Sequence, residues 1–124
     1  MAYTSKDYYK VLLKLFGHAY CSGAMNLAKL LELYNRAQAE HEDIDLQTIY
    51  NYIADEIKKN PAAIERSIRV YLKAVISDVG IDYINETLDY KFKQTNTITI
   101  SEFLPVFSLY FNELKDLESK EETE

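Results

Sequence analysis

The single cysteine and the first of two histidines are the natural place to look for catalysis. His18 and Cys21 are three residues apart, but nucleophilic catalysis by a thiolate also needs an orienting group and a cleft. Gly17 is expected to end a helix beside them. We therefore expect a buried cysteine near a surface histidine, and no catalytic pair.

His41 lies in the acidic segment 40–45, whose carboxylates could in principle bind a divalent cation. The segment has neither the spacing nor the sharp-turn glycine of a calcium-binding loop, so we expect a solvated loop without a metal. The chain also lacks a Walker A sequence, a glycine-rich dinucleotide loop, an H-E-x-x-H sequence and paired cysteines. These absences predict a protein that is not an enzyme and has no cofactor.

The most informative pattern is in Ile49–Val75, where two amphipathic segments are joined by the short turn Lys58–Asn60. Helix pairs with so short a connection include those that place their second helix in the major groove of DNA. Ala54 is small enough to let the two helices approach closely, and Ile64 is expected to lock the second helix onto the first. The turn lacks the glycine found in many such motifs, so an ordinary helical hairpin also fits.

The second helix of this pair has one apolar and one basic face. At about 100° per residue, Ile64, Ile68, Tyr71, Leu72 and Val75 share one sector. The roughly opposite sector holds Ala62, Arg66, Arg69 and Lys73, with Glu65 between the two. Arginine at such positions can bind guanine O6 and N7, and Lys58, Lys59 or Asn60 can hold a phosphate at the helix N-terminus.

The charge of the chain is unevenly distributed. The net charge is −6, yet residues 56–73 sum to +3 and 1–35 to +2, whereas 36–55 sum to −4, 74–112 to −3 and 113–124 to −4. The strongly basic island therefore coincides with the second helix of the pair. Binding of DNA explains this best, although a solvated helix face or a site for an acidic protein also fits.

Few glycines and prolines interrupt the chain, which favours an all-α fold of about six helices. The expected helices are 5–16, 22–40, 45–58, 61–79 and 81–88, and a last one begins near 101. Residues 90–100 read as an extended loop. A single domain, 1–115, with a helix–turn–helix at 45–79, would then be followed by an acidic, disordered tail at 116–124.

Length and composition place the chain among ordinary globular proteins. Its 124 residues correspond to one domain, and its single cysteine cannot form an internal disulfide. No stretch is long and apolar enough to span a membrane. The first residues lack the basic cluster and apolar core of a signal peptide. We therefore predict a cytoplasmic protein without a membrane partner.

Four stretches, 15–34, 49–73, 81–90 and 101–103, carry a likeness to a known family, and Ile64–Arg69 (I-E-R-S-I-R) is the most specific part. In register and with small gaps over about residues 9–111, the chain resembles the C-terminal DNA-binding effector domain of the stage-zero sporulation protein A response regulators. The resemblance implies an all-α domain with a DNA-reading helix–turn–helix. It assigns DNA contacts to Glu65, Arg66 and Arg69.

The chain departs from the family pattern in two ways. Ala63 stands where the family has a basic residue, and Val70 stands where it has a histidine. Both differences weaken the contact surface, so the target site would differ or DNA binding would be lost. No phosphoacceptor receiver domain precedes residue 10, which indicates a stand-alone relative or an excised domain.

Two functions follow from these patterns. The leading one is a sequence-specific regulator of transcription that inserts residues 61–79 into the major groove of double-stranded DNA. The alternative is an adaptor or antagonist that has lost DNA binding and engages a protein through its acidic surface. A homodimer through the aromatic final helix fits both, although that stripe also fits the core. The candidate DNA-contact residues are Lys58, Lys59, Asn60, Glu65, Arg66, Arg69 and Lys73.

Overall fold

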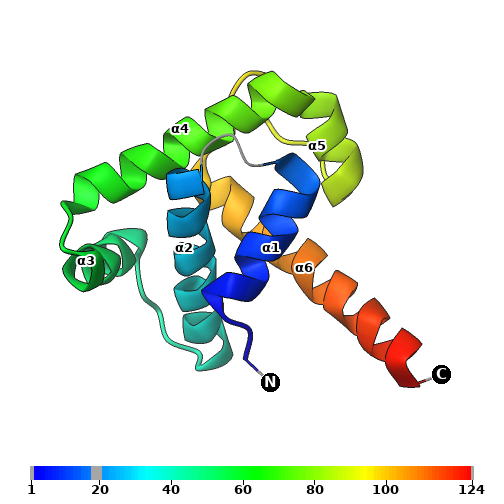
Figure 1. The fold of residues 1–124 in the computed structure, drawn as a ribbon, viewed down its shortest axis with the longest axis horizontal. Coiled ribbons are helices and arrows are strands. Elements are labelled where there is room, and N and C mark those ends of the chain that lie inside the picture. Colours follow the sequence, from blue (N-terminus) through cyan, green and yellow to red (C-terminus); the bar gives the residue numbers. More distant parts are fainter. Residues whose placement is uncertain (1, 18–20, 124) are drawn as a thin grey trace.

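The computed structural model describes residues 2–17 and 21–123, which form six helices and no strand (Figure 1). The helices are α1 (Ser5–Phe16), α2 (Cys21–Ala39), α3 (Leu46–Ile57), α4 (Pro61–Val79), α5 (Ile81–Leu88) and α6 (Ile100–Thr123). The predicted all-α class with about six helices is confirmed. Residues 90–99 form the expected irregular connection. His18 and the side chain of Cys21 lie outside the described part of the chain, so the expectation for this pair stays a prediction.

The helix ends follow local sequence signals. Asn60 accepts a hydrogen bond from the Ala62 N–H at 2.8 Å, and Pro61 is the first residue of α4. A proline costs little there because its missing N–H would have had no partner within the helix. Gly17 and Gly80 end α1 and α4 with φ angles of 88° and 85°, which glycine adopts without steric cost.

Three helices, α2, α3 and α4, contact one another pairwise, and α1 packs against α2. In Figure 1, α4 runs along the upper edge of the molecule, α5 follows it, and the second half of α6 projects away from the body. The largest fully buried side chains come from all six helices: Leu12, Leu27, Leu30, Leu31, Ile53, Ile64, Ile68, Tyr71, Ile84, Phe103, Phe107 and Phe111. The aromatic stripe of α6 therefore closes the core.

Gly23 is the point of closest approach between α2 and α4. A Cβ atom on this residue would overlap the carbonyl oxygen of Ser67 and lie 2.7 Å from the Cβ of Tyr71. Beside it, the Asn26 amide donates to the Ser67 hydroxyl at 2.8 Å, and that hydroxyl donates to the Ile64 carbonyl at 2.7 Å. Close packing and a hydrogen-bond chain thus fix the position of the first two turns of α4.

A buried carboxylate ties α1 to α2. Glu32 is 8% exposed and accepts hydrogen bonds from the Ser5 N–H at 2.6 Å and from the Arg36 guanidinium at 2.8 Å. The N–H groups of a first helical turn have no partner within their own helix, and a carboxylate there also meets the positive end of the helix dipole. Glu32 therefore holds the start of α1 on the side of α2.

The prediction of a disordered tail at 116–124 is wrong for residues 116–123. Helix α6 continues to Thr123, and the Lys115 ammonium lies 3.2 Å from the Glu118 carboxylate. No glycine or proline follows Pro105 in this helix, and leucine, lysine and glutamate favour helix. The acidic composition that suggested disorder is compatible with an exposed helical extension.

Candidate nucleic-acid interface

The α3–α4 hairpin forms as the sequence predicts, with three residues between its helices. Lys58 adopts the left-handed conformation (φ 60°, ψ 45°), and the Lys59 N–H donates to the Ala54 carbonyl at 2.9 Å. Ala54 and Ile64 are 3% and 1% exposed, as expected for residues between the two helices. A non-glycine residue in the left-handed region thus makes the turn for which the sequence offered no glycine.

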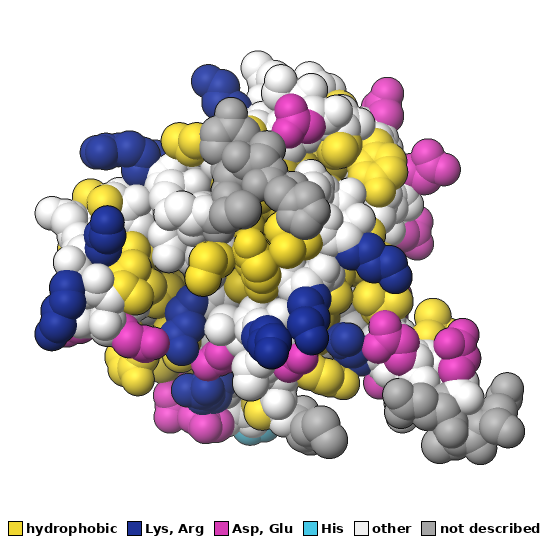
Figure 2. Space-filling model, in the orientation of Figure 1, with side chains coloured by type: hydrophobic (Ala, Val, Ile, Leu, Met, Phe, Trp, Pro, Cys, Tyr) yellow, Lys and Arg dark blue, Asp and Glu magenta, His cyan; other side chains and the backbone are white. Residues whose placement is uncertain are grey.

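Four cations lie on the solvent side of this hairpin. Lys58, Lys59, Arg66 and Lys73 are all exposed. None of them forms an ion pair with another described residue. Figure 2 shows dark blue side chains along the edge of the molecule that α3 and α4 form, whereas magenta side chains gather near α5 and along the projecting end of α6. The basic stretch of the sequence therefore lies along this edge, although dark blue side chains also occur over the middle of the molecule.

Arg69 and Glu65 differ from these four residues. Their side chains form an ion pair across one turn of α4, and the Arg69 side chain remains 70% exposed. The pairing neutralises part of the basic face that the helical wheel predicted. Glu65 thus sets the orientation of Arg69, which contributes less net charge to the hairpin than Arg66 does.

Asn60 has a structural role in the hairpin. Its side-chain oxygen caps α4, as described above, so this oxygen is already engaged. Ala63 and Val70, the two departures from the family pattern, are both exposed, and Val70 is 48% exposed. The two changed positions therefore lie on the solvent side of α4 with Arg66, where they alter the contact surface without disturbing the core.

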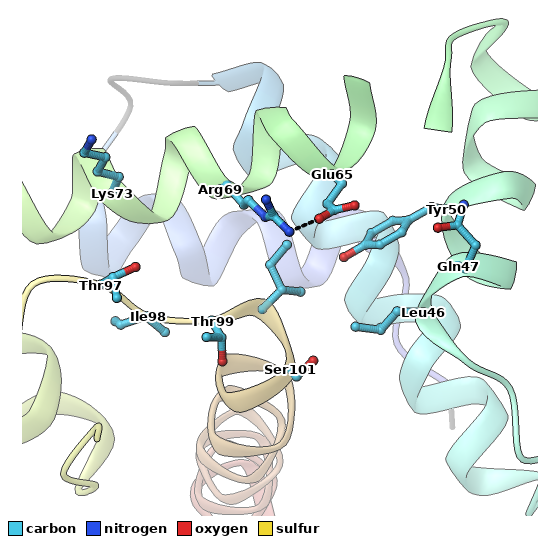
Figure 3. A pocket seen from close by; sticks show the side chains of 11 residues that line it. Leu46, Gln47, Tyr50, Glu65, Arg69, Lys73, Thr97, Ile98, Thr99 and Ser101 are labelled. Atoms are coloured by element: carbon cyan, nitrogen blue, oxygen red, sulfur yellow. Dashed lines mark ion pairs between the residues drawn. The ribbon is translucent and has the colours of Figure 1, made fainter. Parts of the chain in front are cut away.

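A groove of about 530 Å³ runs beside α4 (Figure 3). Figure 3 shows Arg69 and Glu65 on one side, Tyr50 and Gln47 of α3 on a second, and the chain entering α6 on a third. The lining residues are Leu46, Gln47, Tyr50, Glu65, Arg69, Lys73, Thr97, Ile98, Thr99, Ile100 and Ser101. Three of the predicted DNA-contact residues, Glu65, Arg69 and Lys73, therefore share one concave surface.

Sequence reasoning missed the remaining walls of this groove. Residues 97–101 are about 30 positions from Arg69, and their Thr-Ile-Thr-Ile pattern suggested only an extended loop. Ile98 and Ile100 are each 6% exposed, while the alternating residues Thr97, Thr99 and Ser101 are exposed. This alternation of anchored and open side chains was the available signal for a segment with one face on the core.

The acidic segment around His41 gathers no metal site. No group of three or more histidine, cysteine, aspartate or glutamate side chains among the described residues is arranged to hold a metal ion. His41 itself is exposed, with φ of 56°. No helix in residues 2–17 and 21–123 has the length and apolar character needed to cross a membrane.

Comparisons with known proteins identify no relative of this chain. No family model matches it, and neither a curated protein nor a solved structure is significantly similar. Functional conclusions therefore depend on the residues and geometry of this chain.

Proposed function

We propose that the protein binds double-stranded DNA through the α3–α4 hairpin, with α4 entering the major groove, and so regulates transcription. The observation that carries this proposal is a set of four exposed cations on the hairpin that form no ion pair with another described residue: Lys58, Lys59, Arg66 and Lys73. Such a surface suits the phosphate backbone, whose neutralisation dominates DNA affinity. The short connection Lys58–Asn60 between α3 and α4 supports the proposal, because helix–turn–helix proteins join their two helices by a turn of this length.

Arg66 is the residue best placed to read a base. It lies on the side of α4 away from the core, and no carboxylate among the described residues engages its guanidinium. A guanidinium presents two parallel donors that match guanine O6 and N7. The likeness of Ile64–Arg69 to the sporulation effector-domain motif supports this role, and it stays a prediction because no comparison identified a relative.

The proposal is tested in two steps. The protein first selects bound sequences from a pool of random DNA duplexes, and fluorescence anisotropy then measures its affinity for the enriched sequences. Arg66→Ala should weaken binding by about 1–3 kcal/mol if Arg66 reads a base. Lys91→Ala is the matched control, since it removes one exposed cation outside the hairpin. Equal losses in the two variants would show that α4 is not the reading element.

The salt dependence of the same titration tests the electrostatic part. Four cations that neutralise about four phosphates should give a slope of roughly −3 to −4 in a plot of log affinity against log salt. Arg66→Ala should reduce the magnitude of that slope by about 1. Absence of binding to any duplex at about 50 mM salt would refute the proposal.

A second candidate, binding of a basic protein, is favoured by the acidic side of α5. Asp82, Glu86 and Asp89 are exposed there around a shallow depression of about 490 Å³. A partner with a basic surface would meet complementary charge. Recovery of a stoichiometric partner that Asp82→Asn with Glu86→Gln releases, together with no DNA binding, would favour this candidate over the first.

A further inference from the structure

A tyrosine hydroxyl faces the groove beside α4. Tyr50 is 4% exposed, and Figure 3 shows its hydroxyl pointing into the groove. No hydrogen bond joins this hydroxyl to another described residue. Burial raises the pKa of Tyr50 to about 12, a rise that the nearby Glu65 carboxylate increases and Arg69 opposes. The phenol is therefore protonated at neutral pH, and its hydroxyl can donate a hydrogen bond into the groove.

Two cations lie on the α4 wall of the same groove. Arg69 pairs with Glu65, yet a guanidinium has five N–H donors and one carboxylate cannot occupy all of them. Lys73 lies one turn further along α4 and has no ion pair among the described residues. Together with Glu65, these side chains leave one net positive charge in the groove.

The opposite wall offers hydroxyl groups and the start of a long helix. Thr99 Oγ1 accepts a hydrogen bond from the Glu102 N–H at 3.2 Å, which leaves its own proton available for donation. Ser101 and Thr97 also line the groove. Helix α6 begins at Ile100, so the positive end of its dipole lies beside these hydroxyls.

The floor of the groove is apolar in part. Leu46, Ile98 and Ile100 contribute to its lining. A volume of about 530 Å³ lies within the range of small-molecule sites, which combine apolar walls with a few convergent polar groups. The groove thus suits a ligand with a charged end and an apolar body.

We propose that this groove binds a small organic anion. The oxyanion, a carboxylate or a phosphate monoester, accepts hydrogen bonds from the Tyr50 hydroxyl and Arg69 and meets the charge of Lys73, and its apolar body contacts Leu46 and Ile98. The groove site goes beyond the proposed DNA binding: the two share Lys73, but the groove site does not need Lys58, Lys59 or Arg66. Such a ligand competes with Glu65 for Arg69, so it would change the orientation of Arg69 on α4.

The test uses three probes with the same aromatic body: phenyl phosphate, benzoate and the neutral benzyl alcohol. Amide chemical shifts of the ¹⁵N-labelled full chain are followed by NMR at millimolar probe concentrations. We expect phenyl phosphate or benzoate to shift Gln47, Tyr50, Thr99 and Ser101 saturably, and the one with the stronger effect identifies the oxyanion. Benzyl alcohol should leave these residues nearly unchanged.

Two substitutions locate the site. Tyr50→Phe removes the hydroxyl that faces the groove and should weaken binding of the anionic probe about tenfold, whereas Tyr52→Phe on the exposed side of α3 should not. Arg69→Gln, at a largely exposed side chain, should weaken it similarly while Lys59→Gln does not. Spectra of each variant show directly whether it folds.

Three results would overturn the proposal. The first is that neither anionic probe shifts the amide signals saturably. The second is that Tyr50→Phe and Arg69→Gln bind the anionic probe as tightly as their control variants do. The third is that a DNA duplex shifts the groove residues while neither small anion does, which would assign the groove to the DNA backbone.

Discussion

At the scale of single residues, two arginines on one face of α4 have different surroundings. The helical wheel placed Arg66 and Arg69 together, but Arg69 pairs with Glu65 and lines a groove, whereas Arg66 lies on the outer surface. The spacing of Glu65 and Arg69 already permitted an ion pair across one turn. The spacing of residues within α4 could not predict the groove, because its other walls come from α3 and residues 97–101.

Gly23 provides a prediction at this scale. Gly23→Ala should lower the free energy of unfolding by about 1–3 kcal/mol, because the added methyl group would overlap the Ser67 carbonyl and displace α2 from α4. The higher helix propensity of alanine recovers at most about 1 kcal/mol. Urea unfolding followed by circular dichroism measures the change.

Ser22→Ala, one position earlier in α2 and exposed, is the control for this substitution and should change stability by less than about 0.5 kcal/mol. If Gly23→Ala were as stable as Ser22→Ala, the distance between α2 and α4 at their crossing would be greater than in the structure.

At the scale of elements, caps and helix stops were the most predictable features. Asp45, Asn60 and Gly80 bound α3 and α4 where the sequence placed them. The C-terminal end of α6 was not predictable in the same way. Charge density suggested disorder there, whereas helix propensity and the Lys115–Glu118 ion pair favour the helix that forms.

The cap of α3 makes this element sensitive to acid. Hydrogen bonds from the Thr48 side chain and then its backbone N–H hold the pKa of Asp45 below its ordinary value of 3.8. A lowered carboxyl pKa contributes stability above pH 3.8 that is lost as the pH falls through the lower value in the folded protein. The stabilising effect of Asp45 should therefore disappear at strongly acidic pH.

Asp45→Asn keeps a favourable cap but cannot titrate. We expect the unfolding free energy of the original protein to fall more than that of the variant when the pH is lowered from about 5 to about 2.5. Urea unfolding at these two pH values measures it. A difference that does not change with pH would rule out titration of Asp45 as a contributor to acid stability.

At the scale of the whole molecule, the net charge of −6 is unevenly distributed: residues 56–73 sum to +3 and residues 1–35 to +2, whereas the acidic excess lies in 36–55 and 74–124. In Figure 2 several dark blue side chains lie along the hairpin edge, and magenta side chains lie near α5 and along the end of α6. An uneven field of this kind can orient a protein toward a polyanion and repel it from the other faces. On the DNA-binding proposal, the acidic end of α6 opposes association at low salt.

Deletion of residues 116–124 tests this effect, since it removes four net negative charges, and residues 116–121 are exposed. The thermal midpoint should change little, because the core ends at Phe111 and the half-buried Leu114. DNA affinity at low ionic strength should rise about twofold or more, and the difference should vanish at about 1 M salt, where charges are screened beyond about 3 Å. Unchanged affinity at low salt would show that the α6 extension does not oppose DNA binding.

The sequence by itself determined the helices, their caps, the short α3–α4 connection and the basic island, because these depend on neighbours within a few positions. It also indicated which face of α4 is buried, since helical periodicity alone fixes that face. Only the tertiary structure decided that Arg69 shares a groove with Tyr50 and Thr99, and that the backbone of Ser67 packs closely against Gly23. These arrangements join segments far apart in the chain, and they arise from packing of whole helices, which no local pattern of residues encodes.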